Sequence, residues 1–310
     1  MSNELIEKVI NSLSEEKSEL FVQEQDAPTL IEKKYVEVYN GDAFSNQEIN
    51  TYLAENFCDV IVLGGLPYNG KSTLISCIYD KFLQDGEFQQ YEFVNTKTII
   101  GFEKRSYLAR LSAGQQPNTK RTFRTDNPFL NLTLKQSKTN SIKRLILVDT
   151  SGEVFDDFKK NSSTIDNFKA ISRANHFSYI FDISLIQDLK QKHSAKSSLK
   201  TIFRGIEDLK MFPPNIKIEL IFTKWDKISD EYKSEADNYI KSILEELKLI
   251  ITKIPITAYK ISSISDLQKF ELPELFEYWL QSDTVHDYDK IITKENINWI
   301  NDYIKYLDHE

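Results

Sequence analysis

The sequence is poor in cysteine and methionine, has few glycines and prolines, and contains no long apolar run. Among its 310 residues are two cysteines, two methionines, nine glycines and eight prolines. No apolar stretch approaches the roughly 18 residues that a membrane-spanning helix requires. Cys58 and Cys77 stand in largely apolar surroundings, where buried thiols are expected rather than a disulfide or a metal-binding pair. We also find no internal repeat and no low-complexity tract in the sequence.

The charge balance excludes some partners. The formal net charge is −8 at pH 7, which argues against general nucleic-acid binding through the whole surface. Residues 1–8 are acidic and lack the basic-then-apolar layout of a secretory signal. These observations favour a cytoplasmic location without membrane attachment. With 40% hydrophobic residues, the chain can build one large α/β domain with appendages, or two domains.

Basic side chains nevertheless gather in one segment, from Lys97 to Thr125, in which only Glu103 is acidic. Its basic residues are Lys97, Lys104, Arg105, Arg110, Lys120, Arg121 and Arg124. The segment is either a solvated basic face or a surface directed at phosphate or at a partner.

Residues 65–72 carry the most informative motif of the chain. They read Gly-Leu-Pro-Tyr-Asn-Gly-Lys-Ser and match the spacing G-x-x-x-x-G-K-[ST]. Glycine permits positive φ and close approach of the backbone, so successive N–H groups can point at phosphate oxygens. The amine of Lys71 can reach the β- and γ-phosphates, and the hydroxyl of Ser72 can ligate Mg²⁺. The predicted nucleotide contacts of this loop are Gly65, Asn69, Gly70, Lys71, Ser72 and Thr73.

The residues on either side of the loop support this interpretation over a chance glycine-containing turn. Residues 59–63 form a short β-branched apolar run, typical of a buried parallel strand, and residues 73–83 have helical apolar spacing. Strand, loop and helix therefore follow in the order that brings a helix N-terminus beside the phosphates.

The remaining pattern predicts an α/β fold with three layers, in which helices cover both faces of a mostly parallel sheet. Further strands are expected at 34–39, 129–134, 145–148, 179–181, 216–222 and 254–257, with 129–134 and 145–148 as a hairpin. Further helices are expected at 45–53, 185–211, 231–251, 273–280 and 295–307. We expect an acidic N-terminal extension over 1–33, a strand–helix lead-in over 34–57, the nucleotide-binding domain over 58–282 and a C-terminal helical tail over 283–310.

A second motif follows the strand expected at 145–148. That strand runs into Asp149-Thr150-Ser151-Gly152, where the carboxylate is placed to hold Mg²⁺ through water. Gly152 can offer its N–H to a γ-phosphate. An isolated D-x-x-G would be an ordinary turn after a strand, but its position after the phosphate loop and a hairpin favours the nucleotide role.

A third motif, Thr223-Lys224-Trp225-Asp226, follows the strand expected at 216–222. The Asp226 carboxylate can accept hydrogen bonds from N1–H and the exocyclic amine of guanine. Adenine lacks this donor pair and would leave the carboxylate unpaired, which is costly. Lys224 can lie over the base or tie back to the phosphate loop. Thr257-Ala258-Tyr259, expected after the last strand, is where a backbone N–H could meet the guanine carbonyl; a plain loop explains this segment too.

In this order the motifs resemble those of the P-loop GTPases of the translation-factor-related class, over roughly residues 58–282. A finer likeness, in residues 98–105, 119–122, 149–153 and 224–226, is to the double-GTPase family of bacterial conflict systems. The resemblance implies binding of GTP and GDP with Mg²⁺. It also implies an antiphage or stress-response operon with a protein partner, often a second GTPase.

The same resemblance places Thr122 in switch I, where it would close over Mg²⁺ and the γ-phosphate, with Thr119 and Thr125 as alternatives. Arg121 or Arg124 would act as an internal arginine finger or belong to a solvated basic loop. The predicted catalytic residues are Lys71, Thr122 and Glu153, and the predicted metal ligands are Ser72, Thr122 and Asp149.

Two residues depart from the family pattern. Tyr68 stands where many relatives have the asparagine that supports potassium-assisted hydrolysis, and Asn69 follows one residue later. Glu153 stands where relatives often have Gln or His to orient the attacking water, and its charge would repel the γ-phosphate unless offset. We therefore expect a GTP-binding and hydrolysing switch with slow turnover in the absence of a partner.

Two other kinds of protein could carry the same phosphate-loop motif: a nucleotide-binding scaffold and an ATP-using enzyme. A pseudo-GTPase scaffold would hold GTP as a structural ligand with little hydrolysis, as the departures at Tyr68 and Glu153 allow. An ATP-using P-loop kinase or ATPase has no need for the motif at 223–226, which makes it the weaker alternative.

Overall fold

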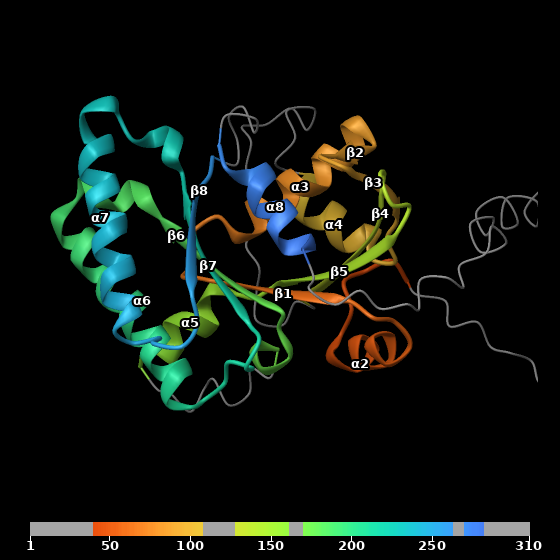
Figure 1. Cartoon of the computed structure of the whole chain (residues 1–310), viewed down its shortest axis with the longest axis horizontal. Helices are drawn as coiled ribbons and strands as arrows, with labels where there is room; N and C mark the ends of the chain where they lie inside the picture. The colour runs from red at the N-terminus through yellow and green to blue at the C-terminus, as the bar shows by residue number, and fades with distance from the viewer. Residues whose placement is uncertain (1–39, 108–127, 161–169, 263–269, 282–310) are drawn as a thin grey trace, which may run out of the picture. The chain divides into compact units, whose positions relative to one another are not determined.

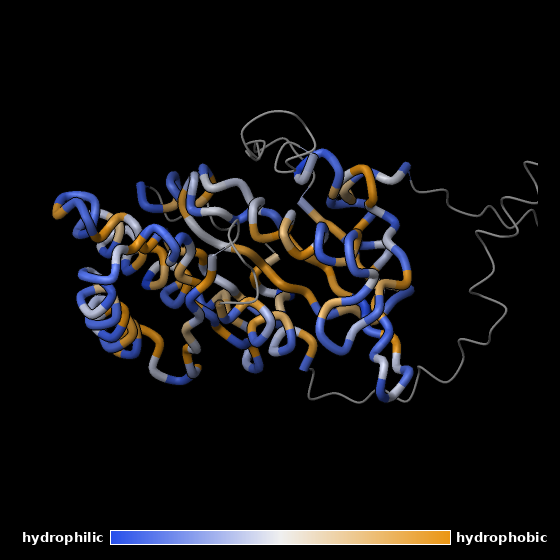
Figure 2. The backbone as a smooth tube through the Cα atoms, turned by 90° about the horizontal axis from the view of Figure 1, so that it is seen from above, coloured by the Kyte–Doolittle hydropathy of each residue, from blue (hydrophilic) through white to orange (hydrophobic). Residues whose placement is uncertain are grey.

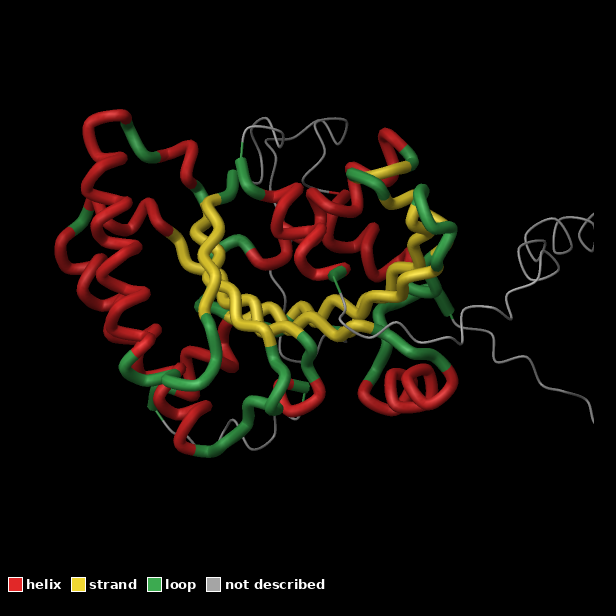
Figure 3. Tube along the Cα trace, viewed as in Figure 1, coloured by secondary structure: helices red, strands yellow, loops and turns green. Residues whose placement is uncertain are grey.

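In the computed structural model, residues 40–107, 128–160, 170–262 and 270–281 are described, and they form an α/β domain with an eight-stranded sheet. Figures 1 and 3 show the sheet crossing the middle of this domain with helices on both of its faces. The strands are β1 (Asp59–Gly64), β2 (Glu87–Phe88), β3 (Tyr91–Asn95), β4 (Phe129–Gln136), β5 (Ile142–Asp149), β6 (His176–Asp182), β7 (Lys217–Thr223) and β8 (Ile256–Lys260). Their order across the sheet is β2-β3-β4-β5-β1-β6-β7-β8.

The strands β5, β1, β6, β7 and β8 are neighbours and run parallel, so their C-terminal ends lie along the same edge of the sheet. Within this group, Val62 of β1 pairs with Val148 of β5 and Phe177 of β6. Strands covered on both faces are apolar on both sides, and every residue of β1 and β6 is accordingly buried. The predicted α/β fold with a mostly parallel sheet is confirmed.

The other part of the sheet is antiparallel. β4 and β5 form the predicted hairpin, and the sheet continues through β3 and β2, which the sequence analysis missed. β2 has only two residues, and the pairing of β3 with β4 shifts register between Phe93 and Asn95. Such short or irregular strands lack the sustained period of two by which strands are recognised.

Helices cover both faces of the sheet, which gives the three predicted layers. The described α-helices are α2 (Asn46–Glu55), α3 (Lys71–Asp85), α4 (Ile99–Ser106), α5 (Gly152–Phe158), α6 (Leu189–Asp208), α7 (Asp230–Lys248) and α8 (Leu272–Leu280). One apolar cluster joins α3, α4 and α8 to one face, and a second joins α2, α5, α6 and α7 to the other. Figure 2 shows the apolar stretches running along the strands and the inner sides of these helices.

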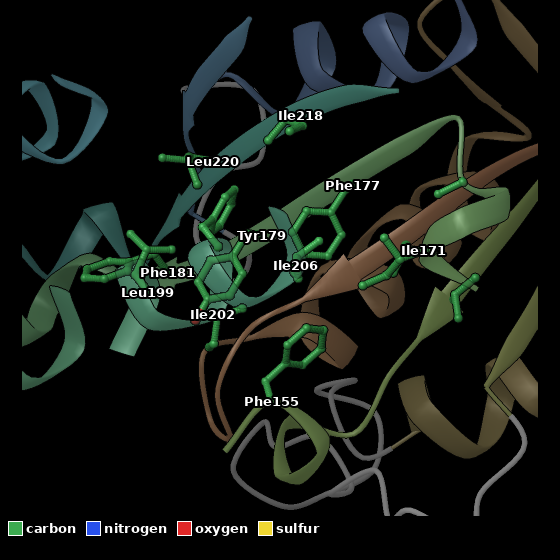
Figure 4. Packing of buried hydrophobic residues seen from close by; sticks show 14 of the residues in the cluster. Phe155, Ile171, Phe177, Tyr179, Phe181, Leu199, Ile202, Ile206, Ile218 and Leu220 are labelled. Carbon is green, nitrogen blue, oxygen red and sulfur yellow. The ribbon is translucent and has the colours of Figure 1, made fainter. Parts of the chain in front are cut away.

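The second cluster fixes the start of α5 against the sheet. Phe155 of α5 packs against two rings of β6, with centroid distances of 6.4 Å to Phe177 and 6.3 Å to Tyr179. Figure 4 shows these three rings together with Leu199, Ile202 and Ile206 of α6. All of them are buried, so α5 has a fixed position although it has only seven residues.

The local signals for α2 and for the end of α3 are confirmed. Ser45 and Glu48 form a capping box at the start of α2: the Ser45 hydroxyl accepts from the Glu48 N–H, and the Glu48 carboxylate accepts from the Ser45 N–H. α3 ends where expected, because Gly86 adopts a left-handed conformation with φ of 73°.

Two other predicted elements need correction. The helix expected over 185–211 is divided into the 3-10 turn η5 (Ile183–Gln187) and α6, because the Asp188 carboxylate accepts hydrogen bonds from the N–H groups of Lys190 and Gln191 and starts a new helix. The strand expected at 254–257 is β8, which begins and ends later, at Ile256–Lys260. The proline at 255 belongs to the preceding loop, since proline cannot donate a hydrogen bond to a strand.

α4 and α5 were not predicted. α4 has a glycine inside it, Gly101, and its cap residue Thr98 makes no side-chain capping bond, so local signals for a helix are weak. Tertiary contacts compensate: the N–H groups of Ile100 and Gly101 both donate to the Gly41 carbonyl. A Cβ atom at Gly101 would lie 2.6 Å from the Ala43 nitrogen, so only glycine allows this close approach.

A buried polar network joins β6, β7 and α8. His176 Nδ1 lies 2.7 Å from one carboxylate oxygen of Glu219, and the Ser178 hydroxyl donates to the other at 2.7 Å. The indole N–H of Trp279 in turn donates to the Ser178 hydroxyl at 3.0 Å. Burial raises the pKa of Glu219, and its hydrogen bond with His176 opposes that shift. Each polar group is therefore satisfied where water cannot reach.

Some predicted features lie outside the described residues: the N-terminal extension, the strand at 34–39 and the helix at 295–307. Among the described helices, none combines the length and the hydrophobicity needed to cross a membrane. Cys58 is buried and Cys77 partly buried, both are free thiols, and burial raises the pKa of each to about 12.

Candidate nucleotide site

The predicted phosphate loop connects β1 to α3 at the edge where the parallel strands end. Its two glycines have positive φ, 134° at Gly65 and 96° at Gly70. A Cβ atom at Gly65 would lie 2.5 Å from the Ile180 carbonyl oxygen, so this position requires glycine for space as well as for conformation. Tyr68 also has positive φ, 65°, which is unusual for a side chain of its size.

The start of α3 suits an anion. Gly70 is its N-cap residue and makes no side-chain capping bond, in contrast to Ser45 at the start of α2. The first N–H groups of a helix have no acceptor within the helix, and the helix dipole adds partial positive charge there. Lys71, Ser72 and Thr73 form this first turn, as the phosphate-binding interpretation requires.

Lys71 is buried beneath the loop. Its ammonium group donates hydrogen bonds to the carbonyl oxygens of Gly65, at 2.8 Å, and Leu66, at 2.9 Å. Burial lowers the pKa of Lys71 to about 8, although the Asp149 carboxylate favours the charged form. Phosphate oxygens would favour the charged form further and would compensate the lost hydration.

Ser72 and Asp149 lie together, as a shared role in metal binding requires. The Ser72 hydroxyl is 3.2 Å from each carboxylate oxygen of Asp149, which is fully buried at the end of β5. Next to it, the Thr150 hydroxyl is buried and has no hydrogen-bond partner among the described residues. A hydroxyl and a carboxylate are the oxygen donors that Mg²⁺ prefers, with water completing its octahedral shell. These residues fit the ion, although the described part of the chain holds no cluster of three or more His, Cys, Asp or Glu side chains.

Gly152 brings the second motif into contact with the phosphate loop. It is the first residue of α5, whose N-cap residue Ser151 accepts a hydrogen bond from the Glu153 N–H at 3.4 Å. A Cβ atom at Gly152 would lie 2.3 Å from the Pro67 nitrogen and 2.6 Å from the Leu66 carbonyl carbon. The two segments that would enclose the phosphates thus touch through the backbone of Gly152.

The third motif is tied to the phosphate loop by side chains. The Thr223 hydroxyl donates to the Asn69 carbonyl at 2.7 Å, and the Asn69 amide donates to the Ile180 carbonyl at 2.8 Å. The side chains of Thr223 and Asn69 therefore hold the loop in place, so contact of Asn69 with nucleotide would fall to its backbone. Lys224, which has φ of 59°, donates to the Tyr68 carbonyl at 3.1 Å and to the Asp182 carboxylate.

Asp226 follows β7 and accepts a hydrogen bond of 2.6 Å from the Ser262 hydroxyl. Thr257 and Ala258, by contrast, lie inside β8, where they pair with Glu219 and Leu220 of β7. Their placement after the last strand was wrong, because β8 continues to Lys260. Ser262, two residues after that strand ends, is the residue that the structure brings to Asp226. The sequence could have indicated it only through its distance from the strand end, which was predicted three residues too early.

The chain matches the model of the Double-GTPase 2 family over residues 59–280, which is more than half of its length. The chain belongs to the Double-GTPase 2 family. The resemblance found in the motifs is thereby confirmed, and the described domain is a P-loop GTPase domain. Among curated proteins, none matches the sequence.

Solved structures similar to this Double-GTPase 2 chain are distant. The elongation factor SelB of Methanococcus maripaludis, in complex with the GTP analogue GppNHp, is 14% identical with a TM-score of 0.41, over 74% of this chain and 36% of that one. A putative nucleolar GTP-binding protein 1 of Plasmodium falciparum is 18% identical with a TM-score of 0.38, over 81% and 95%. A bacterial selenocysteine-specific elongation factor is matched over only 28% of its own length, so this chain spans well under half of each of the two elongation factors.

The Double-GTPase 2 domain also contains a basic residue whose role the sequence analysis missed. Arg105 of α4 donates from Nε to the Asp149 carboxylate at 2.7 Å and from Nη1 to the Gly101 carbonyl at 2.9 Å. It was placed only in a basic segment, since the helix that aims it was not predicted. Thr119, Arg121, Thr122, Arg124 and Thr125 lie outside the described residues, so the switch I predictions stay predictions.

Proposed function

We propose that this domain binds GTP and GDP with Mg²⁺ and hydrolyses GTP slowly, as a molecular switch. One observation supports this most: three motifs distant in sequence meet at the C-terminal edge of the sheet, linked by Ser72 to Asp149 and by Asn69 to Thr223. In this proposal Ser72, Asp149 and Thr122 hold the metal, while Lys71 and the first turn of α3 bind the phosphates. Asp226 would accept hydrogen bonds from guanine.

The experiment that tests this is a binding titration of the full chain with fluorescent GDP in the presence of Mg²⁺, with unlabelled GTP, ATP and XTP as competitors. We expect GTP to compete and ATP to fail, because adenine lacks the donor pair that Asp226 would accept. The variant Asp226→Asn should favour XTP over GTP. Equal competition by ATP and GTP would contradict the proposal, and an unchanged base preference in Asp226→Asn would remove that residue from the role.

We further propose that the switch acts on a protein partner, such as a second GTPase, in a bacterial defence operon. The partner and the operon rest on the family's expected biology, and a cytoplasmic location rests on the sequence pattern at residues 1–8 and on the apolar runs of the chain. A pseudo-GTPase scaffold is the second candidate, favoured by the left-handed backbone at Tyr68 and by Glu153 after Gly152. Single-turnover release of phosphate, measured with and without the products of neighbouring genes, distinguishes the two, because a scaffold would release little in either case.

A further inference from the structure

Arg105 and Asp149 form a buried ion pair at the predicted metal position. The Nε–Oδ2 distance is 2.7 Å, and the side chains are 9% and 0% exposed. The same carboxylate lies 3.2 Å from the Ser72 hydroxyl through each of its oxygens. A guanidinium therefore already supplies positive charge to the carboxylate that Mg²⁺ would use.

The backbone of α4 holds the guanidinium of Arg105 beside Asp149. Its Nη1 donates to the Gly101 carbonyl of α4, and the N–H of Gly101 donates to the Gly41 carbonyl at 3.1 Å. On the other side of α4, the Glu103 carboxylate accepts a hydrogen bond of 2.9 Å from the Tyr79 hydroxyl of α3. Arg105 thus joins Asp149 to the backbone of α4, and a change in the ion pair must also change the contacts of this helix.

Mg²⁺ and a guanidinium on one carboxylate repel each other, and the repulsion is strong where water is excluded. Each cation is favoured by the same negative charge, so binding of one weakens binding of the other. The connection runs in both directions, because coupling between two binding equilibria is reciprocal. A site with a resident arginine therefore requires more Mg²⁺ than one without it.

We propose that Arg105 is a positioning residue that competes with Mg²⁺ for Asp149, so that arrival of the metal with nucleotide releases Arg105 and loosens α4. The inference rests on the proposed binding of Mg²⁺ and guanine nucleotide. α4 is followed at once by the segment that contains the switch I candidates, Thr119, Thr122 and Thr125. Release of Arg105 would give the metal site a direct connection to that segment.

The first test measures the affinity of the full chain for fluorescent GDP as a function of free Mg²⁺. In Arg105→Gln, we expect the Mg²⁺ midpoint, which is the Mg²⁺ concentration that gives half of the full increase in GDP affinity, to fall about tenfold. A change of this size is within the usual range for coupled sites. Arg105→Lys keeps the charge and should stay near the wild type. Lys104→Gln is the matched control: it removes one positive charge from the same helix, but Lys104 pairs with Asp42 at the surface and should leave the midpoint unchanged.

A purely structural ion pair would give a different result, with a lower melting temperature in Arg105→Gln and no change in the Mg²⁺ midpoint. That result, or a higher midpoint, would overturn the inference. If no variant binds GDP at any Mg²⁺ concentration, the proposed function itself fails. If GDP binds and the midpoints agree, only the role of Arg105 fails.

A second measurement needs no variant and covers the case in which Arg105→Gln does not fold. Amide hydrogen exchange of the wild-type chain is compared with GDP in Mg²⁺ and with GDP in EDTA. We expect faster exchange in α4 with Mg²⁺ and unchanged exchange in α7, which belongs to the apolar cluster on the other face of the sheet. Equal exchange of α4 in the two conditions would overturn the inference.

Discussion

The Ser262 hydroxyl donates a hydrogen bond of 2.6 Å to the Asp226 carboxylate, and this contact joins the loops that follow β7 and β8. Asp226 is the proposed acceptor for guanine. A carboxylate oriented by a neighbouring hydroxyl loses less rotational freedom when a base binds. Ser262 therefore orients the base-binding group from a different strand end.

The variant Ser262→Ala should weaken GTP binding by about tenfold or more, since hydrogen bonds to charged groups contribute about 1.5–3 kcal/mol and each 1.4 kcal/mol is a factor of about ten. The measurement is competition of GTP against fluorescent GDP, with thermal unfolding to show that the variant is folded. Thr257→Val is the control, because Thr257 lies inside β8 and should leave the affinity unchanged. A larger loss of GTP affinity in Thr257→Val than in Ser262→Ala would instead support the prediction that Thr257 lies at the guanine base.

The variant Gly152→Ala should lose GTP affinity more than GDP affinity. Its Cβ would lie 2.3 Å from the Pro67 nitrogen, so the second motif and the phosphate loop must separate, and the N–H proposed for the γ-phosphate moves with them. Gly86→Ala is the control: it adds a methyl group where no atom lies within 4 Å, at φ of 73°. We expect that control to cost about 1–2 kcal/mol of stability through its left-handed backbone and to bind both nucleotides normally. Equal losses of GTP and GDP affinity in Gly152→Ala would contradict the role of its N–H.

Binding of GDP should take up a proton at pH values above about 8. Burial lowers the pKa of Lys71 to about 8 in the nucleotide-free domain, and phosphate favours the charged amine. Below about pH 8 the amine is already charged and affinity should be flat; above it, affinity should decline. The lowered pKa also means that burial of the charged Lys71 amine lowers the free energy of unfolding, and this loss is complete below about pH 8. The loss diminishes as the pH rises from about 8 towards the ordinary pKa of 10.5.

Calorimetry of GDP binding in two buffers with different ionisation enthalpies measures this proton uptake. Lys71→Arg is the control, because arginine remains charged over the whole range. Proton uptake of the same size in the wild type and in this control would exclude Lys71 as its source.

The free energy of unfolding should fall as the pH rises above the ordinary pKa of Glu219, 4.5, and this fall should be smaller in Glu219→Gln. Burial raises the pKa of this carboxyl group, so the folded chain keeps a proton that the unfolded chain has released. Glutamine can still hydrogen-bond with His176 and Ser178 without a charge. Urea unfolding at acidic and neutral pH measures the difference, and the exposed Glu87→Gln is the control. Parallel pH profiles for wild type and Glu219→Gln would show that Glu219 does not titrate in this range.

The sequence was sufficient where a motif is also a local structure. Glycine spacing, an apolar strand and a helical period lie within residues 59–83, and the structure has the strand, the loop and the helix in the predicted order. The mostly parallel sheet with helices on both faces followed from the alternation of strands with helices.

The sequence was insufficient where a helix or a contact depends on residues that are distant along the chain. α4 exists because Gly101 packs against Ala43 and Gly41, and no pattern within α4 reveals this. Arg105 therefore could not be assigned to Asp149. Ser262 was missed because the end of β8 was placed three residues too early, and in a sheet such an error changes which residues reach the edge.

The position of Asn69 has a consequence for biosynthesis. The phosphate loop is made early, but its shape depends on Ile180 and Thr223, which are 111 and 154 residues further along the chain. A growing chain on the ribosome would therefore have the whole octapeptide outside the exit tunnel long before it could hold a nucleotide. Affinity for nucleotide would arise only when β6 and β7 have joined the sheet beside β1, so ligand binding would report completion of the domain.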